Sequence, residues 1–486
     1  MRHTLGQLIT FDMLPDDALL EIFDFYVVED FVPYDERRIE EWITLAHVCR
    51  RWRSVVFQSP RRLNLRLLCT PDKPARDSLD IWPSFPLVIY DSYNILWNDS
   101  DTSGVDNIIA ALEHNDRVCQ IQLGSLSSSE FKYFTNSAAM QEPFPELTHL
   151  GLGGFGLKSI LPDSLLGGTA PPRLRSLNLS NVPFPGLPRL LLSATHLVNL
   201  DLYDIPRSGY IPPELMATSL SALANLKSLR LHFQYPQPRT VLESRGPRPR
   251  PLTRSVLLSL TKILFKGSSK YLEEILSQID APRLDQMRIT FFNHIFFDTP
   301  QLSQFISRRP TLRTPGKGQI GFNSNAIVFK FPSQTSDYVL DVQLPFTSSG
   351  WQPLSLERVC TSSLPPLSTL EDLYIVEDPY LLRPRWQDDT ENTLWLDLLR
   401  TFVAVKNLYL SEEYVPCIAS ALQELVGGRT TEVLPALEKI FLAGFQPFEP
   451  LHEGIQKFVA ARRLTDHPVA VSRWDRDSKQ ERPRDL

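Results

Sequence analysis

The sequence predicts an α/β protein in which a small helical module precedes an irregular solenoid of strand-and-helix repeats. Two patterns carry this prediction. Apolar side chains recur at helical spacing near the N-terminus, and beyond residue 110 a six-residue apolar pattern returns again and again. A chain of 486 residues is also too long for one ordinary hydrophobic core, so we expect several domains or one repetitive domain.

The helical module begins at Pro15. Proline and the two aspartates that follow it suit the first turn of a helix, because proline needs no hydrogen-bond partner there and carboxylates favour the positive end of the helix dipole. Apolar residues up to Tyr26 then recur three and four residues apart. We expect a second helix from Ile39 to Phe57. So few short helices cannot cover their own apolar faces and must bury them against something else.

These two segments resemble the F-box. LPDDALLEIFDFY (14–26) has its Leu-Pro start and Ile-Phe pair, and LAHVCRRWRSVVF (45–57) has its Val-Cys-Arg-Arg-Trp run. The resemblance covers roughly residues 12–60 and implies a three-helix fold. A polar insertion at 28–41 is expected to form a loop. An ordinary helical cap packed on the rest of the chain is the alternative.

The resemblance also implies partners. F-boxes dock on the Skp adaptor, which connects a substrate receptor to the cullin scaffold of a ubiquitin ligase. Some of the matching residues must also hold the module itself together. Carried over by matching position, the adaptor contacts are Leu14, Pro15, Leu19, Ile22, Phe23, Leu45, Val48, Cys49 and Trp52.

The recurring pattern is LxxLxL, the strand segment of a leucine-rich repeat. One copy means nothing because leucine is common, but many copies at regular intervals indicate stacked units that share a continuous core. The asparagine or cysteine usual at the ninth position is missing, so we expect an irregular solenoid. Copies begin at 118, 147, 174, 197, 226, 260, 284, 370, 405 and 437.

The order of these segments resembles fungal F-box proteins, especially those of mushroom-forming species, over essentially the whole length. The domains expected are an F-box at 1–60, a connecting segment at 61–110, a leucine-rich-repeat-like substrate-binding domain at 111–465 and a disordered, charged tail at 466–486. Inside the repeats we expect a mobile Pro- and Arg-rich loop at 235–254 and an inserted β-hairpin at 310–350, formed by 326–331 and 338–344.

The third and fifth residues of each repeat strand should point away from the core, onto an open face. Arginine and aromatic residues anchor many protein interfaces. We therefore expect Arg230, Arg288, Tyr374 and Tyr409 to contact a protein substrate. The alternative is that these side chains are merely solvated, or are covered by the inserted hairpin.

Other classes of function find little support. The net charge of −6 indicates neither nucleic acid nor a membrane as partner, and no apolar run approaches the roughly 18 residues of a membrane span. The five separated cysteines and the absence of an apolar signal region before Asp12 predict a cytoplasmic or nuclear protein. GLGGFG (151–156) lacks the acidic residue of a dinucleotide site. We expect no catalytic residues, metal or cofactor.

The sequence therefore predicts a non-catalytic substrate-receptor subunit of an SCF-type cullin ubiquitin ligase, which holds the Skp adaptor and an unknown protein substrate. Three alternatives remain: an F-box scaffold that acts outside ubiquitination, a repeat interaction protein that never meets the adaptor, and, more remotely, an enzyme.

Overall fold

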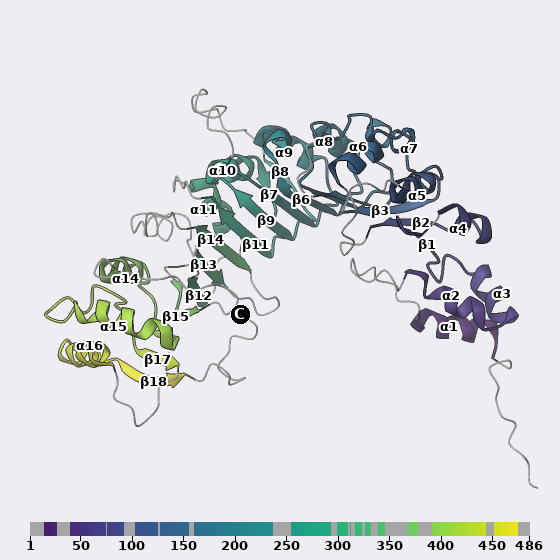
Figure 1. Ribbon diagram of the computed structural model, residues 1–486. Helices are drawn as coiled ribbons and strands as arrows, with labels where there is room; N and C mark the ends of the chain where they lie inside the picture. Colours follow the sequence, from purple (N-terminus) through teal and green to yellow (C-terminus); the bar gives the residue numbers. More distant parts are fainter. Residues whose placement is uncertain are drawn as a thin grey trace, which may run out of the picture. The chain divides into compact units, whose positions relative to one another are not determined.

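The computed structural model describes residues 14–26, 39–73, 75–91, 103–124, 127–154, 160–236, 254–292, 299–309, 312, 316–322, 326–331, 339–345, 367, 369–377, 391–443 and 452–474. The chain forms two compact units, Met1–Leu197 and Val198–Leu486. The mixed α/β class is confirmed, with N-terminal helices followed by a strand-rich repeat region (Figure 1).

The first unit starts with three helices and continues as a parallel sheet. Its helices are α1 (Asp16–Tyr26), α2 (Trp42–Val48), α3 (Arg50–Gln58), α4 (Ala75–Ile81), α5 (Ser103–Leu112), α6 (Ser128–Asn136), α7 (Ala138–Gln141), η3 (Leu165–Gly168) and α8 (Leu187–Ser193). Its strands are β1 (Leu67–Cys69), β2 (Leu87–Tyr90), β3 (Val118–Leu123), β4 (His149–Gly153) and β5 (Ser176–Ser180), which pair in this order.

The second unit continues the same architecture. Its strands are β6 (Asn199–Ile205), β7 (Ser228–Phe233), β8 (Ser255–Val256), β9 (Lys262–Gly267), β10 (Ile279–Asp280), β11 (Gln286–Phe291), β12 (Lys317–Phe322), β13 (Ala326–Phe331), β14 (Leu340–Pro345), β15 (Asp372–Glu377), β16 (Asn407–Leu410), β17 (Lys439–Ala443) and β18 (Ala470–Trp474). Its helices are η4 (Arg207–Gly209), α9 (Pro213–Ser221), α10 (Ser269–Gln278), α11 (Pro300–Ser307), α14 (Glu391–Arg400), η8 (Glu412–Tyr414), α15 (Val415–Gln423) and α16 (Glu453–Leu464).

Nearly every LxxLxL copy becomes a strand that starts at the third residue of the pattern. The first leucine lies in the turn before the strand, as Leu226 does before β7, where its N–H bonds the carbonyl of Leu223 at 3.1 Å. The fourth and sixth residues, Leu229 and Leu231 in β7, are buried on the face that the helices cover. The alternating residues of the strand form the open face. The pattern thus fixes both the register and the two faces of the sheet.

In one repeat, an asparagine next to the ninth position takes over the role of the asparagine that a regular repeat has at that position. Asn181, one place before the expected ninth position, has a φ of 57°. Asparagine tolerates this left-handed conformation better than most residues. Its side-chain amide donates to the carbonyl of Gly154 at 3.1 Å, which ties β5 to the turn after β4. The solenoid is therefore irregular, with individual contacts in place of an asparagine ladder.

The stretch expected to hold an inserted hairpin forms three strands of the sheet. β13 pairs antiparallel with both β12 and β14. The two outer strands of this meander continue the sheet in parallel, since β14 pairs with β11 and β12 pairs with β15. The strands lie inside the sheet instead of being added to its surface, because their apolar residues fill the core on one side.

The structure corrects two expected boundaries. The segment 61–110 is no mere connection, because it contains β1, β2, α4 and most of α5, and β2 pairs with β3. The segment 466–486 is not entirely a tail, because β18 pairs with β17 and buries Trp474 to 4% exposure. One large apolar side chain outweighs the charged composition around it. Residues 237–253 of the loop expected at 235–254, most of the insertion at 28–41 and the residues after 474 lie outside the described residues.

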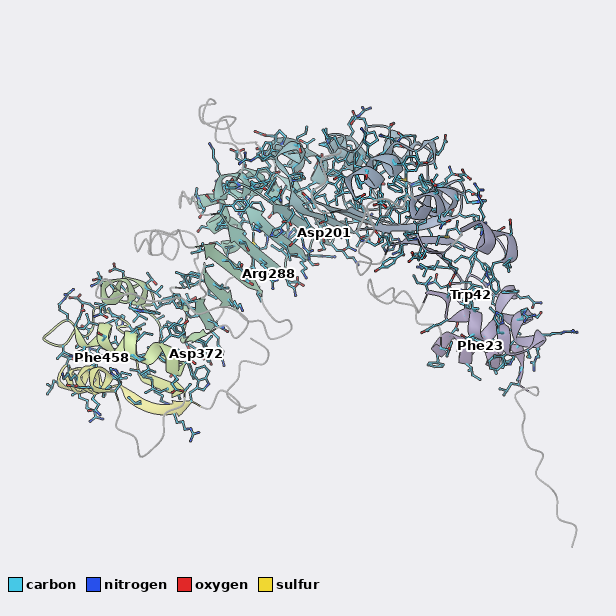
Figure 2. The ribbon with its side chains drawn as sticks, in the orientation of Figure 1. Phe23, Trp42, Asp201, Arg288, Asp372 and Phe458 are labelled. Carbon is cyan, nitrogen blue, oxygen red and sulfur yellow. The ribbon has the colours of Figure 1, made fainter. Side chains whose placement is uncertain are left out.

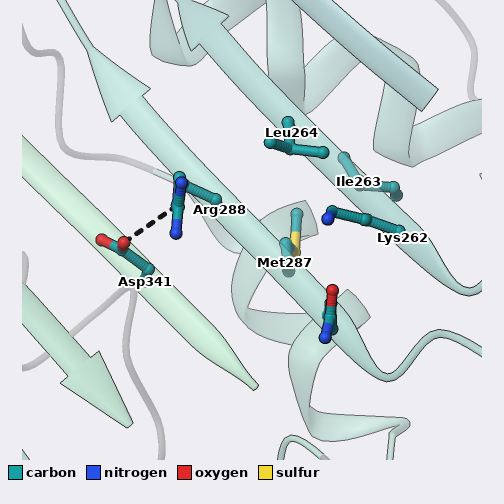
Figure 3. A pocket seen from close by; sticks show the side chains of 7 residues that line it. Lys262, Ile263, Leu264, Met287, Arg288 and Asp341 are labelled. Atoms are coloured by element: carbon teal, nitrogen blue, oxygen red, sulfur yellow. Dashed lines mark ion pairs between the residues drawn. The ribbon is translucent and has the colours of Figure 1, made fainter. Parts of the chain in front are cut away.

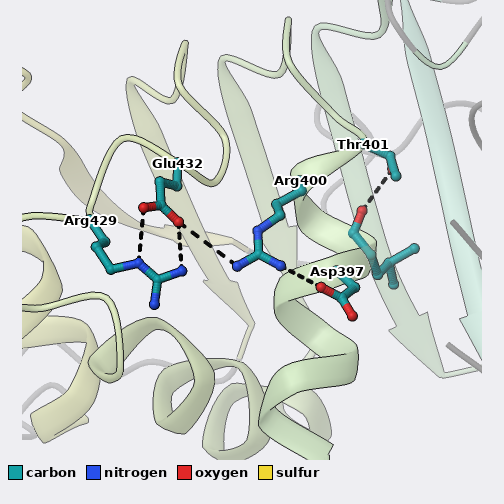
Figure 4. Close-up of polar contacts among 6 residues, drawn as sticks. Asp397, Arg400, Thr401, Arg429 and Glu432 are labelled. Carbon is teal, nitrogen blue, oxygen red and sulfur yellow. Dashed lines mark hydrogen bonds and ion pairs between the residues drawn. The ribbon is translucent and has the colours of Figure 1, made fainter. Parts of the chain in front are cut away.

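Polar contacts join neighbouring repeats at the C-terminal end of the second unit. Arg400, the last residue of α14, pairs with Asp397 of the same helix and lies 3.8 Å from Glu432, which also pairs with Arg429 at 2.8 Å (Figure 4). These side chains are partly exposed, so each pair adds little stability by itself. Their effect is to orient the α14 end and the loop after α15 toward each other.

We expect Leu229→Ala to lower the free energy of unfolding by about 2–5 kcal/mol, because Leu229 is 2% exposed and its truncation leaves a cavity in the core. Chemical denaturation monitored by circular dichroism measures this change. Ser228→Ala, one residue away on the open face of β7, is the control and should leave the midpoint nearly unchanged. Equal midpoints for the two variants would contradict the assignment of the faces.

Candidate functional site: a helical surface and an open sheet face

Helix α1 has two apolar faces, and only one is buried. Leu19, Leu20 and Phe23 are at most 9% exposed and form the core of the three-helix module, where Figure 2 labels Phe23. On the other side Ile22, Phe25 and Tyr26 are 41%, 89% and 46% exposed. Their spacing of three and four residues makes them neighbours on one helical face. A solvated row of large apolar side chains is typical of a surface that binds a partner.

The second helix expected from Ile39 is broken into α2 and α3. The break lies at Cys49, whose backbone is extended with a φ of −157°. The sulfur of Cys49 accepts a hydrogen bond from the N–H of Trp52 at 3.4 Å and so caps α3. Trp52 then packs on Phe23, with 4.8 Å between ring centroids. Val48, just before the break, is 56% exposed.

The structure separates the residues expected to contact the adaptor. Leu19, Phe23 and Leu45 are buried inside the module, so they stabilise its fold and are not accessible to a partner. Pro15, Ile22 and Val48 are exposed, and Leu14, Cys49 and Trp52 are partly exposed. Sequence reasoning missed Phe25 and Tyr26, although their spacing from Ile22 was a usable signal.

Charged residues hold α1 against α3 and the turn that follows it. Arg51 pairs with Asp16 at 2.7 Å and also bonds the carbonyl of Leu14. Arg62 pairs with Asp24 at 2.8 Å and with Glu21. These acceptors include both ends of α1, so the arginines fix its direction while leaving the Ile22 face exposed.

An aromatic cluster joins the helical module to the first strands of the same unit. Trp42 is fully buried, with the rings of Trp82 and Phe85 each 5.3 Å away. Its indole N–H donates to the carbonyl of Arg66 at 2.9 Å. Close packing around one large side chain restricts the movement of the module relative to β1 and β2.

The open face of the second unit carries ion pairs across adjacent strands. Arg230 of β7 pairs with Asp201 of β6 at 2.7 Å. Arg288 of β11 pairs with Asp341 of β14 at 3.0 Å, beside a shallow depression of about 150 Å³ (Figure 3). The side chains of these arginines remain 40% and 50% exposed. Each arginine is therefore oriented by its aspartate partner and remains accessible to a binding partner.

The two tyrosines expected on this face have a different role. Tyr374 is only 2% exposed and stacks on Tyr409 at 4.2 Å, which in turn stacks on Phe441 at 4.4 Å. Trp474 packs edge-on against both tyrosines. Tyr374 is therefore not accessible to a substrate, because it is buried against Tyr409 and against Trp474 of β18, a strand that the sequence did not predict. Tyr409 is partly exposed.

Two titratable side chains near β7, His232 and Asp201, have shifted pKa values. Burial, together with Lys266 and Arg230, lowers the pKa of His232 to about 4. Burial raises the pKa of the Asp201 carboxyl, and Arg230 lowers it in part. Asp204 lies 3.6 Å from His232 but does not overcome the burial and the two cations. His232 is neutral near pH 7, so the charge here comes from lysine and arginine.

Comparison with known proteins supports the reading of the N-terminal module. Residues 11–65 match the family model described as F-box-like. No curated protein matches the chain. Among solved structures, the leucine-rich repeat-containing protein LegL7 from Legionella pneumophila is similar at 14% identity, with 75% of this chain and 95% of that chain covered and a TM-score of 0.28.

No helix in the described part of the chain combines the length and apolar character needed to cross a membrane. Among the described residues there is also no group of three or more His, Cys, Asp or Glu side chains placed to hold a metal ion.

We expect His232 to make the second unit less stable in acid. Its folded-state pKa of about 4 lies below the ordinary value of 6.5, so the folded state binds fewer protons than the unfolded chain and stability falls as pH falls through this interval. His232→Gln should show a smaller loss of melting temperature between pH 7 and pH 4. His467→Gln, at an exposed position, is the control. Identical pH profiles for His232→Gln and the wild type would refute the assignment.

Proposed function

We propose that this chain is the substrate-receptor subunit of an SCF-type cullin ubiquitin ligase. The main observation behind this proposal is that the segment matching the F-box-like family presents an exposed apolar row on α1, formed by Ile22, Phe25 and Tyr26. The module binds the Skp adaptor, the adaptor connects it to the cullin scaffold, and the open face of the repeat sheet binds a target protein.

The adaptor-binding surface follows from exposure. Pro15 just before α1, Ile22 on α1 and Val48 at the end of α2 are solvated, and Phe25 of α1 adds a ring that is 89% exposed. Covering such side chains removes apolar area from water at about 25 cal/mol per Å². Aromatic and aliphatic anchors of this kind dominate the energetics of many interfaces. The buried Leu19 and Phe23 support the surface from below.

The function needs no chemistry within the chain. A receptor acts by holding its target at a high effective concentration near the ubiquitin carrier. The Trp42 cluster favours this role, because it restricts the movement of the adaptor-binding module on the first strands of the sheet. We place the activity in the cytosol or nucleus, where the separated cysteines suit a reducing environment.

Ile22→Glu should weaken binding to a purified Skp adaptor at least tenfold, or by about 1.4 kcal/mol, because it places a charge in an apolar contact. Isothermal titration of the full chain measures the affinity. Ile160→Glu is the matched control, since Ile160 is a similarly exposed isoleucine outside the module. Equal affinities of the two variants would remove α1 from the interface, and no binding by the folded wild type would overturn the proposal.

A second experiment separates a receptor from a scaffold. The full chain is reconstituted with adaptor, cullin, ubiquitin-activating and ubiquitin-conjugating enzymes, and proteins captured by the wild type are tested for ubiquitination. We expect modification with the wild type and with Ile160→Glu, and a large loss with Ile22→Glu. Capture without modification, although the adaptor is bound, would favour a scaffold that acts outside ubiquitination.

A further inference from the structure

Four cations surround one leucine on the open face of the second unit. Leu264 of β9 is paired in register with Arg230 of β7 on one side and with Arg288 of β11 on the other. Lys262 and Lys266 lie two residues before and after it on the same strand, and therefore on the same face. Adjacent strands are about 4.8 Å apart and alternate residues of a strand about 6.6 Å apart, so the four positively charged residues border a small area. We refer to these five residues as the Leu264 surface.

The two arginines of the Leu264 surface already have partners among the described residues. Asp201 and Asp341 pair with the arginines from the strands farther out. Within the part of the chain that the structure describes, neither Lys262 nor Lys266 forms an ion pair. These four cations outnumber the nearby carboxylates of Asp201, Asp341 and Asp204, which leaves a local excess of positive charge on a chain whose net charge is −6.

The geometry of Arg288 favours a further ligand. Its contact with Asp341 joins Nε to Oδ2, and Asp341 is almost completely buried, with 4% of its side chain exposed. A buried carboxylate holds the guanidinium in place while half of the arginine side chain stays in solvent. The terminal nitrogens of Arg288 make no hydrogen bond to the described residues. Arginine presents several donors in a fixed plane, so it can bond Asp341 and an incoming oxyanion at the same time.

The shape of the Leu264 surface excludes several kinds of ligand. The depression beside Arg288 measures about 150 Å³, whereas pockets for small molecules usually measure about 300–1,000 Å³. Leu264 is among the residues that line it, so part of the contact is apolar. Nucleic acid would require a longer run of cations along the face, and toward β17 the face becomes aromatic instead.

We propose that the Leu264 surface binds an acidic segment of a target protein, with an apolar side chain on Leu264 and oxyanions against Lys262, Lys266 and Arg288. This inference rests on the proposed function, since it defines the class of target that the repeat sheet holds. Carboxylate and phosphate share the required chemistry, because both accept charge-assisted hydrogen bonds from lysine and arginine.

The test uses the full chain, both alone and mixed with the adaptor, and three labelled peptides whose binding is followed by fluorescence anisotropy at low ionic strength. In the first peptide a leucine is flanked on each side by glutamates, in the second by phosphoserines, and in the third by glutamines. We expect the first, the second or both to bind, and the glutamine peptide to bind at least tenfold more weakly. A preference between the first two identifies the source of the anion.

Variants then locate the contact. The double substitution Lys262→Glu and Lys266→Glu should reduce the affinity for the acidic peptide at least tenfold, and Leu264→Ala should reduce it less. Lys439→Glu is the matched control, because Lys439 is an exposed lysine on the open face of distant β17. The proposal is overturned if the glutamine peptide binds as well as the acidic ones, if no acidic peptide binds, or if the double variant and the control behave alike.

The same preparations separate this proposal from the proposed function. A protein that binds the adaptor but neither acidic peptide overturns the Leu264 surface and leaves the receptor role intact. A protein that binds an acidic peptide but not the adaptor supports the Leu264 surface and overturns the receptor role.

Discussion

The structure depends on the burial of one short apolar pattern. In most LxxLxL segments the first apolar residue lies in the turn before the strand, and the fourth and sixth residues point into the core, as Leu226, Leu229 and Leu231 do. No single repeat covers these side chains, so each strand needs its neighbours. Because the burial fixes which face points inward, it also fixes which residues remain on the open face. The ion pairs of Arg230 and Arg288 across adjacent strands are a consequence of that register.

The sequence predicted the periodic parts of the molecule and not the parts that depend on a single side chain. Strand positions and the two faces of the sheet follow from the pattern itself. The break at Cys49 does not, because it depends on the conformation of one residue that caps α3. The burial of Tyr374 and the strand that contains Trp474 do not either, because they result from contacts between residues distant in the chain. The expected adaptor contacts were divided for the same reason. Spacing identifies an amphipathic helix, but only packing shows that Phe23 is inside and Phe25 outside.

The open face of the second unit changes character along the sheet. From β6 to β14 it is lined by charged residues that pair between strands, whereas near β15 to β18 it is lined by stacked rings of Tyr374, Tyr409 and Phe441. The aromatic end is largely closed by Trp474, while the charged end retains exposed lysine and arginine. The two ends of the open face therefore differ in how accessible their side chains are to a partner, as well as in their composition.

The β12–β14 meander has a consequence for how the second unit folds. In the rest of this sheet successive repeats pair side by side, so structure can spread from one repeat to the next. Here the spatial order is β11, β14, β13, β12 and β15, so the last strand of the meander is the one that meets the preceding repeat. The sheet cannot be continuous until all three strands have formed together. The meander is therefore the natural boundary between two cooperative folding units. Repeats on either side of it could be lost or duplicated by recombination, but the meander could be inherited only as a whole.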